Sequence, residues 1–235
     1  MNENLAGAWR MYVRAVVFVL AVLFTVGAVG HAVPESLPWM LVLTPGFSLL
    51  TGLLVAAPSV AAGGWRFGIW VAAAYAFTFL TEAAGVATGA IFGEYAYGPT
   101  LGWAWRGVPL IIAFNWVMVV NGAVCLAGRA LPPGLGGWRK PAIMLLAGLL
   151  AALFDFLMEP VAIRLDYWHW AGDGSIPFRN YAAWFVIAAA AAAGHPRQLR
   201  RSCDLGTTGR LAGIYVAMQA VFFVALRIVW RWQGS

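Results

Sequence analysis

Long apolar segments, separated by short polar or proline- and glycine-rich stretches, run through nearly the whole chain. A helix that crosses a bilayer needs about 20 mostly apolar residues, and the segments reach or approach that length. Turn-forming residues separate them, such as Pro34 with Pro38 and Gly63 with Gly64. The pattern predicts about seven transmembrane helices, at residues 11–30, 39–57, 66–90, 107–127, 141–164, 178–194 and 209–230.

Two of these segments have a second interpretation. In the first, an apolar run follows Arg10 and Arg14 and ends near Gly30-His31-Ala32, as in a signal peptide, but we expect the segment to be a retained helix. The sixth is short and has Arg179 at its start. It could be re-entrant, which would reverse the side of the membrane on which the chain ends.

The composition agrees with a membrane protein. Of the 235 residues, 62% are hydrophobic and 10% are charged, whereas soluble domains carry roughly 25% charged residues. A soluble fold of this length could not bury so much apolar surface, but lipid can solvate it. We therefore expect an all-α, polytopic integral membrane helix bundle that forms a single domain over residues 1–235, with no soluble appendage.

The net charge of +6 does not indicate a nucleic-acid-binding protein, because the basic residues lie in short loops between apolar segments. Such loops carry more Lys and Arg on the cytoplasmic side. If the N-terminus is placed in the cytoplasm, ten basic residues lie on the inner side of the membrane and five on the outer side. This excess predicts a multi-pass protein of the cell (inner, cytoplasmic) membrane with its N-terminus in the cytoplasm. The inner residues are Arg10, Arg14, Arg66, Arg129, Arg139, Lys140, Arg197, Arg200, Arg201 and Arg210, and the outer ones are Arg106, Arg164, Arg179, Arg227 and Arg231.

Metal-binding residues are sparse. The two cysteines and three histidines are far apart in the sequence and show no metal-ligand spacing. We expect no metal site.

Three acidic residues fall inside predicted helices, where a charge is costly and indicates a functional site. Glu82 lies in the third segment, and Asp155 and Glu159 lie in the fifth. The last two are four residues apart, so they share a helix face, and Pro160 should disturb the helix beside them. All three lie about 7–14 Å below the predicted outer surface. We expect one site that contains all three carboxyls.

Some of these carboxyls should stay protonated, because apolar surroundings disfavour the charged form. A neutral carboxylic acid in an apolar pocket can donate a proton to a weak base. The sequence therefore favours acid catalysis on a lipid-soluble substrate. The alternative is a structural role, in which the acids form hydrogen bonds with backbone groups or ion pairs with Arg164 or Arg106.

Two predicted outer loops flank this site. One contains Glu94, Tyr95 and Tyr97, and the other contains Trp168 and Trp170. Aromatic residues there are typical of a membrane-interface belt, but the hydroxyls and carboxyl of the first loop can also bind water or shape the mouth of a pocket. Two polar residues elsewhere, Asn115 and Asn180, can either line the site or join helix to helix.

A series of short motifs surrounds these positions, over about residues 75–190. In order, they are Glu82-x-x-Gly85-Val86-x-Thr88-Gly89, Phe92-Gly93-x-Tyr95-x-Tyr97, Gly107-Val108-Pro109, Trp116, Asp155-x-x-x-Glu159-Pro160, Tyr167-Trp168-x-Trp170, Ile176-Pro177, Asn180 and Trp184. Together they resemble the membrane carotenoid-biosynthesis family that contains the carotenoid 1,2-hydratases (bisanhydrobacterioruberin and γ-carotene hydratases). Glu94 and the ends, before residue 65 and after residue 195, take no part in the resemblance.

The resemblance implies hydration of the end-group double bond of an acyclic carotenoid to a tertiary alcohol, with no cofactor. Asp155 or Glu159 would protonate the alkene, and Glu82 would position water or stabilise the cation. Aromatic faces could also stabilise the cation. The residues expected to bind the substrate are Glu94, Tyr95, Tyr97, Trp116, Trp168 and Asn180. The expected partners are this lipophilic carotenoid, membrane lipid and other carotenoid-pathway enzymes.

Three other functions compete with hydration. A lycopene-cyclase-like enzyme would begin with the same protonation, but an internal alkene would capture the cation. A retinal protein needs a lysine in the membrane, whereas Lys140, the sole lysine, lies at the mouth of the fifth segment. A proton-coupled transporter could use the same acids, although the chain shows no repeated halves.

Overall fold

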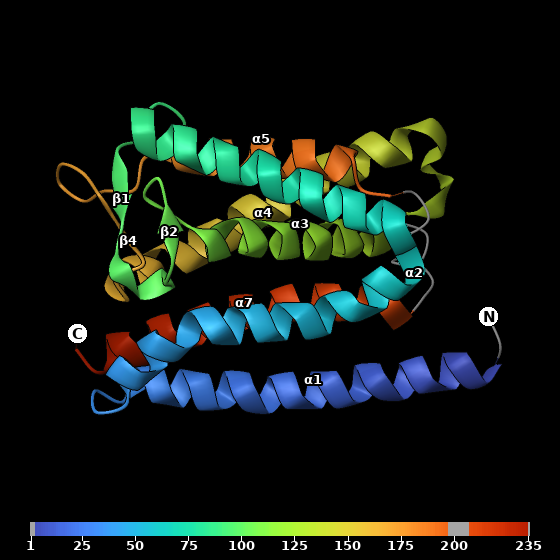
Figure 1. The fold of residues 1–235 in the computed structure, drawn as a ribbon, viewed down its shortest axis with the longest axis horizontal. Helices are drawn as coiled ribbons and strands as arrows, with labels where there is room; N and C mark the ends of the chain where they lie inside the picture. Colours follow the sequence, from blue (N-terminus) through green and yellow to red (C-terminus); the bar gives the residue numbers. More distant parts are fainter. Residues whose placement is uncertain (1–2, 197–206, 235) are drawn as a thin grey trace.

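Long helices lying along one another make up most of the molecule (Figure 1). We analysed a computed structural model, which describes residues 3–196 and 207–234. The helices are α1 (Glu3–Ala32), α2 (Leu37–Thr88), α3 (Leu110–Ala130), α4 (Arg139–Arg164), α5 (Phe178–Ala193) and α7 (Thr207–Trp232). Short 3₁₀ turns at Pro99–Leu101 and Pro133–Trp138 connect them. The predicted all-α class is confirmed.

The helix α2 contains two of the predicted segments. It turns at Gly64, whose φ of 54° and ψ of −146° are not helical. Glycine adopts such angles readily because it has no side chain, so the predicted break at this position is confirmed. Figure 1 shows the two arms, residues 37–63 and 65–88, running back along the bundle in opposite directions.

The number of spanning helices is not confirmed as seven. By length and composition, five of the described helices can cross a membrane, namely α1, α2, α3, α4 and α7. The sixth predicted segment forms α5, which has 16 residues and a length of about 24 Å, against a hydrocarbon core of about 30 Å. The cytoplasmic position of the N-terminus stays a prediction, and Arg197, Arg200 and Arg201, which entered it, lie outside the described residues.

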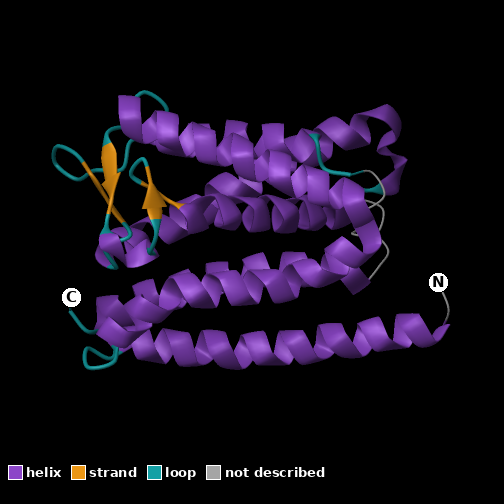
Figure 2. Ribbon diagram, viewed as in Figure 1, coloured by secondary structure: helices purple, strands orange, loops and turns teal. Residues whose placement is uncertain are grey.

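Short strands gather at one end of the helix bundle, which we call the strand end (Figure 2). Here β1 (Tyr95–Tyr97) pairs with β4 (Trp168–Trp170) in an antiparallel ladder, and β2 (Ala104–Trp105) pairs with β3 (Val108–Pro109). The β1–β4 ladder joins the loop after α2 to the loop after α4. These are the two loops that the sequence places beside the acidic site.

The core of the bundle is built around α3, which packs against α2, α4 and α7. Trp116, Val120 and Val124 of α3 are almost fully buried. A smaller apolar cluster joins α1, the first arm of α2 and α7, and it includes Leu20 and Val55. By contrast, the outer faces of α1 and α2 expose many apolar side chains, as expected for helices in contact with lipid.

Two helices that position the site, α4 and α5, approach closely at Gly148. A Cβ atom on this residue would lie 2.6 Å from the backbone oxygen of Phe185, which is closer than packed atoms tolerate. The absence of a side chain therefore sets the distance between these helices. Small residues allow the same close approach in many membrane helix pairs.

We predict that Gly148→Ala lowers the free energy of unfolding by about 1–3 kcal/mol, because α5 must move away from α4. Thermal unfolding in detergent, followed by tryptophan fluorescence, would measure this loss. The control is Gly68→Ala, since a Cβ atom at Gly68 meets no other atom within 4 Å, and it should leave stability unchanged or slightly higher. Equal melting temperatures for the two variants would contradict the prediction.

Candidate active site

A cavity of about 270 Å³ extends across the bundle at the strand end. It is lined mainly by apolar and aromatic side chains, and Glu82 and Glu159 contribute carboxyl groups to its wall. None of the described side chains in the lining is Lys or Arg. A pocket with apolar walls and a few converging polar groups is the usual form of a small-molecule site.

The carboxyl group of Glu82 reaches the cavity from the second arm of α2. Its side chain is 4% exposed. Oε2 accepts hydrogen bonds from the hydroxyls of Tyr95, at 2.5 Å, and Tyr97, at 2.8 Å. Oε1 accepts one from the indole N–H of Trp116, at 2.7 Å. Three protein donors therefore fix the orientation of this carboxyl.

The carboxyl group of Glu159 is held in a similar way from α4. Its side chain is 1% exposed. Oε2 accepts hydrogen bonds from the indole N–H groups of Trp168 and Trp170, each at 3.0 Å. Oε1 accepts one from the amide of Asn180, also at 3.0 Å. Glu82 and Glu159 thus have matching environments on separate helices.

One helical turn before Glu159, Asp155 is fully buried and lies behind the cavity wall rather than in it. Its Oδ2 accepts a hydrogen bond at 2.6 Å from the same Asn180 amide that bonds Glu159. Its Oδ1 has no hydrogen-bond partner among the described residues. Asn180 therefore links the two carboxyls of α4, and one oxygen of Asp155 remains available to carry a proton.

Pro160 follows Glu159 directly, and α4 continues through it to Arg164. Proline has no N–H to donate, so the carbonyl of Phe156 loses its partner in the helix. The guanidinium of Arg227 in α7 lies 3.5 Å from that carbonyl oxygen. The proline thus frees a backbone group next to the acids, and a neighbouring helix contacts it.

The β1–β4 ladder explains why four of the donors converge. Tyr95 is opposite Trp170, and Tyr97 is opposite Trp168. Side chains alternate between the two faces of a strand, so these four aromatic residues share the face that lines the cavity, whereas the intervening Ala96 and His169 are exposed. The ladder covers the acids with aromatic rings.

Gly93 allows the ladder to lie close to its neighbours. Its φ is 132°, which disfavours any residue with a side chain. A Cβ atom here would also lie 2.7 Å from Pro177 and 2.9 Å from the ring of Trp170. This explains the glycine within the motif Phe92-Gly93-x-Tyr95.

The two tyrosines are suited to remain donors. Burial raises the pKa of Tyr97 well above its ordinary value, and the nearby carboxylate of Glu82 raises it further. Burial and Glu82 raise the pKa of Tyr95 in the same way. Both phenols therefore keep their protons near neutral pH and can donate hydrogen bonds to Glu82.

A pair of stacked indoles completes this part of the wall. The rings of Trp116 and Trp184 lie 3.7 Å apart between centroids and are tilted by 19°. Both line the cavity. They place electron-rich faces near Glu82, where a positive charge on a ligand would be stabilised.

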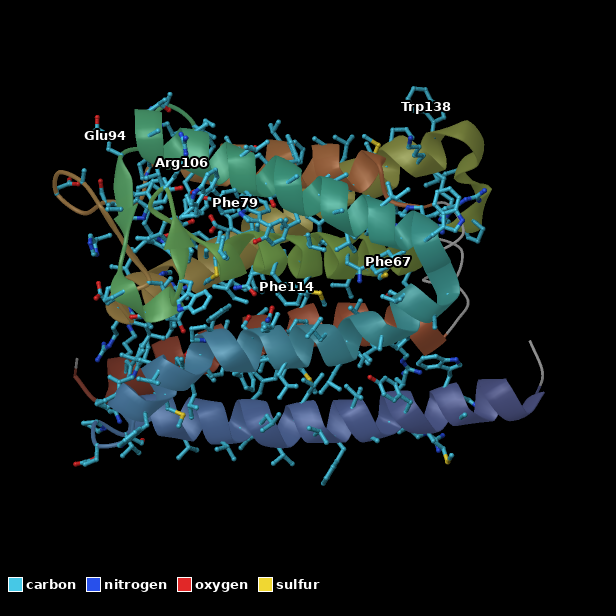
Figure 3. All side chains as sticks on the ribbon, in the orientation of Figure 1. Phe67, Phe79, Glu94, Arg106, Phe114 and Trp138 are labelled. Atoms are coloured by element: carbon cyan, nitrogen blue, oxygen red, sulfur yellow. The ribbon has the colours of Figure 1, made fainter. Side chains whose placement is uncertain are left out.

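The structure brings most of the predicted site residues together. The three acids, with Tyr95, Tyr97, Trp116, Trp168 and Asn180, all lie at or directly behind this cavity wall. Glu94 does not, which corrects its predicted place in the substrate pocket. Its side chain is exposed and lies at the outer edge of the strand end (Figure 3), while its backbone oxygen bonds Ala171 in the ladder.

The sequence prediction omitted several lining residues. Trp170 and Trp184 stood in the motifs but were not assigned to the site, although the spacing of Trp168-x-Trp170 could have shown that both indoles share one face of a strand. The lining from α1, the first arm of α2 and α7 was not predicted either. It includes Phe24, His31, Ser48, Gln219 and Phe222, and no motif marks these positions.

Comparison with known proteins identifies one relative and one family. The chain is 28% identical over 190 residues to the bisanhydrobacterioruberin hydratase of Haloarcula japonica, an alignment that covers 74% of this chain and 62% of that protein. The chain thus spans less than two thirds of the length of that relative. No solved structure matches the chain. The model of the family described as carotenoid biosynthesis protein matches residues 43–233, and the chain belongs to this family.

Proposed function

We propose that this protein adds water to the end-group double bond of an acyclic carotenoid and produces a tertiary alcohol. The observation that carries the proposal is that Glu82 and Glu159 face one aromatic cavity from different helices, each held by three neutral donors. Two positioned carboxyls can supply the acid and the base that hydration requires. The similarity to a protein named as a hydratase supports the same reaction.

In the proposed first step, Glu159 gives a proton to the alkene. The π electrons form a new C–H bond, and the adjacent carbon becomes a tertiary cation. Glu159 is the preferred donor because it lines the cavity, whereas Asp155 lies behind it. Two neighbouring carboxyls in apolar surroundings hold one proton between them at lower cost than two charges. Asp155 therefore acts as a positioning residue, linked to Glu159 through Asn180.

In the second step, a water oxygen forms a bond to the cationic carbon. The extra proton on that oxygen passes to the carboxylate of Glu82, and transfer of that proton from Glu82 to Glu159 restores both carboxyls before the next turnover. The rings of Trp116 and Trp184 stabilise the cation until water attacks. Since the net change is the addition of one water, the reaction needs no redox cofactor.

We predict that Glu159→Gln and Glu82→Gln each lower hydration by about 10²–10⁴-fold, the usual contribution of a positioned acid or base. The test is pigment analysis, by liquid chromatography with mass detection, in a bacterium that makes an acyclic carotene. The wild-type chain should yield a pigment heavier by one water. The matched control is Glu94→Gln, because Glu94 is exposed and lies outside the cavity lining, and it should retain activity.

Other products would indicate a different function. A cyclised pigment of unchanged mass would show that an internal alkene captures the cation, as in a lycopene-cyclase-like enzyme. If several acyclic carotenes remained unaltered although the protein folded, the hydratase proposal would be wrong and proton-coupled transport would become the leading function.

We also predict that Trp116→Phe lowers hydration by roughly tenfold, since it keeps an aromatic face but removes the donor to Glu82. Trp116→Leu should lose more activity, because it also removes the face that stabilises the cation. Rates would be measured at equal amounts of folded protein, checked by size-exclusion chromatography. The control is Trp103→Phe, since Trp103 is highly exposed. Equal rates for Trp116→Phe and Trp103→Phe would exclude this role for the indole N–H.

A further inference from the structure

The cavity continues from the acids toward α1 and the first arm of α2. At this end the lining includes polar side chains such as His31, Thr44 and Ser48, but its wall is mainly apolar, and the lining residues of the first arm include Met40, Leu43 and Phe47. Their spacing of three and four residues puts them on one helix face. On α1, Leu23 and Gly27 line the cavity in the same way. The cavity therefore reaches from the carboxyls at one end to a mainly apolar channel at the other.

This apolar end opens to the outside of the bundle. Of the described residues that line the cavity, Val26 and Leu43 are the two that are exposed, at 56% and 58%. A side chain that lines a cavity and is also exposed marks the rim of an opening. The acid end is closed by comparison, because Glu82, Glu159 and the aromatic residues Trp168 and Trp170 are buried.

The surface around the opening is mainly apolar, which favours lipid over water as its surroundings. Val26 lies six residues before the end of α1, and Leu43 lies six residues after the start of α2. At 1.5 Å per residue, both are about 9 Å along their helices from the connecting loop. Most of the exposed residues next to them, including Val22, Val29 and Val42, are apolar, as expected for a surface that lipid covers.

The size of the cavity limits how much of a carotenoid it can hold. Pockets for drug-sized ligands are roughly 300–1,000 Å³, and this cavity is about 270 Å³. A forty-carbon polyene is larger than such ligands, so it cannot be enclosed. With an end group at the acids, the rest of the chain must leave through an opening, and the apolar one lies between α1 and α2.

We propose that the gap between α1 and the first arm of α2, at Val26 and Leu43, is a lateral opening through which the polyene chain of the substrate passes from lipid to the acids. Only the end group enters the cavity, and the remaining chain stays in the opening and the bilayer. This inference rests on the proposed function for the identity of the substrate. It adds how the substrate enters and which part of it the protein encloses.

The opening can be narrowed with tryptophan at its rim. Val26→Trp and Leu43→Trp should each lower the retention of an acyclic forty-carbon carotene about tenfold. A tenfold loss corresponds to ~1.4 kcal/mol of free energy, which lies within the usual cost of inserting a larger side chain into a packed site. The controls are Val29→Trp and Val42→Trp, since these residues are exposed on the same helices but do not line the cavity. They should match the wild type. Purified full-length protein would be mixed with carotene-containing vesicles and re-purified, and the retained pigment would be measured by absorbance.

Hydration by the same variants in carotene-producing cells separates the two proposals. If pigment retention falls for the rim variants alone while no chain yields a hydrated product, the opening is supported and the proposed reaction is wrong. If hydrated product forms equally in rim and control variants, the reaction is supported and the opening is excluded. Wild-type protein that retains phospholipid but no carotene would overturn the inference, because the channel would then be a site for lipid acyl chains.

Discussion

A carboxyl group inside a membrane protein must find its hydrogen-bond donors within the protein, because lipid supplies none. Glu82 and Glu159 each meet this requirement with three donors. Every donor is an aromatic hydroxyl, an indole or an amide, so it bonds the acid without neutralising it. The donors come from β1, α3, β4 and α5, and the positions of these elements thus depend on where the two carboxyls lie.

The same constraint explains why an otherwise helical protein contains a strand ladder. The loops after α2 and α4 must each place two aromatic donors at a carboxyl, and an extended segment does this with every second residue. Pairing β1 with β4 satisfies the backbone groups of both segments. It also holds two acids from different helices against one cavity. Fixed donors of this kind lower the cost of orienting charge during a reaction, which is the property that acid–base addition to an alkene needs.

The sequence predicted the acids and most of the helices, but not how the loops pair. Glu82, Asp155 and Glu159 stand out because charge is rare in apolar segments, and Gly63-Gly64 marks the turn of α2 because glycine tolerates unusual backbone angles. By contrast, such short strands carry no signal of which segment pairs with which, so the pairing of Tyr95 with Trp170 could not be foreseen. Glu94 was misplaced for the same reason, because its direction depends on the ladder.

The two halves of the cavity differ in how they relate to the family. The acids and their donors all lie within residues 43–233, the part that matches the family model. Of the two residues at the rim of the lateral opening, Leu43 is the first residue of the matched part. Val26 belongs to α1, which precedes the matched part in the sequence. Carotenoids with the same end group differ in the chain beyond it, and in our proposal that chain contacts α1 and the first arm of α2. On this proposal, changes in α1 would alter which carotenoid is accepted while the donors to Glu82 and Glu159 stay in place. Substrate choice and chemistry would then be set by separate parts of one bundle.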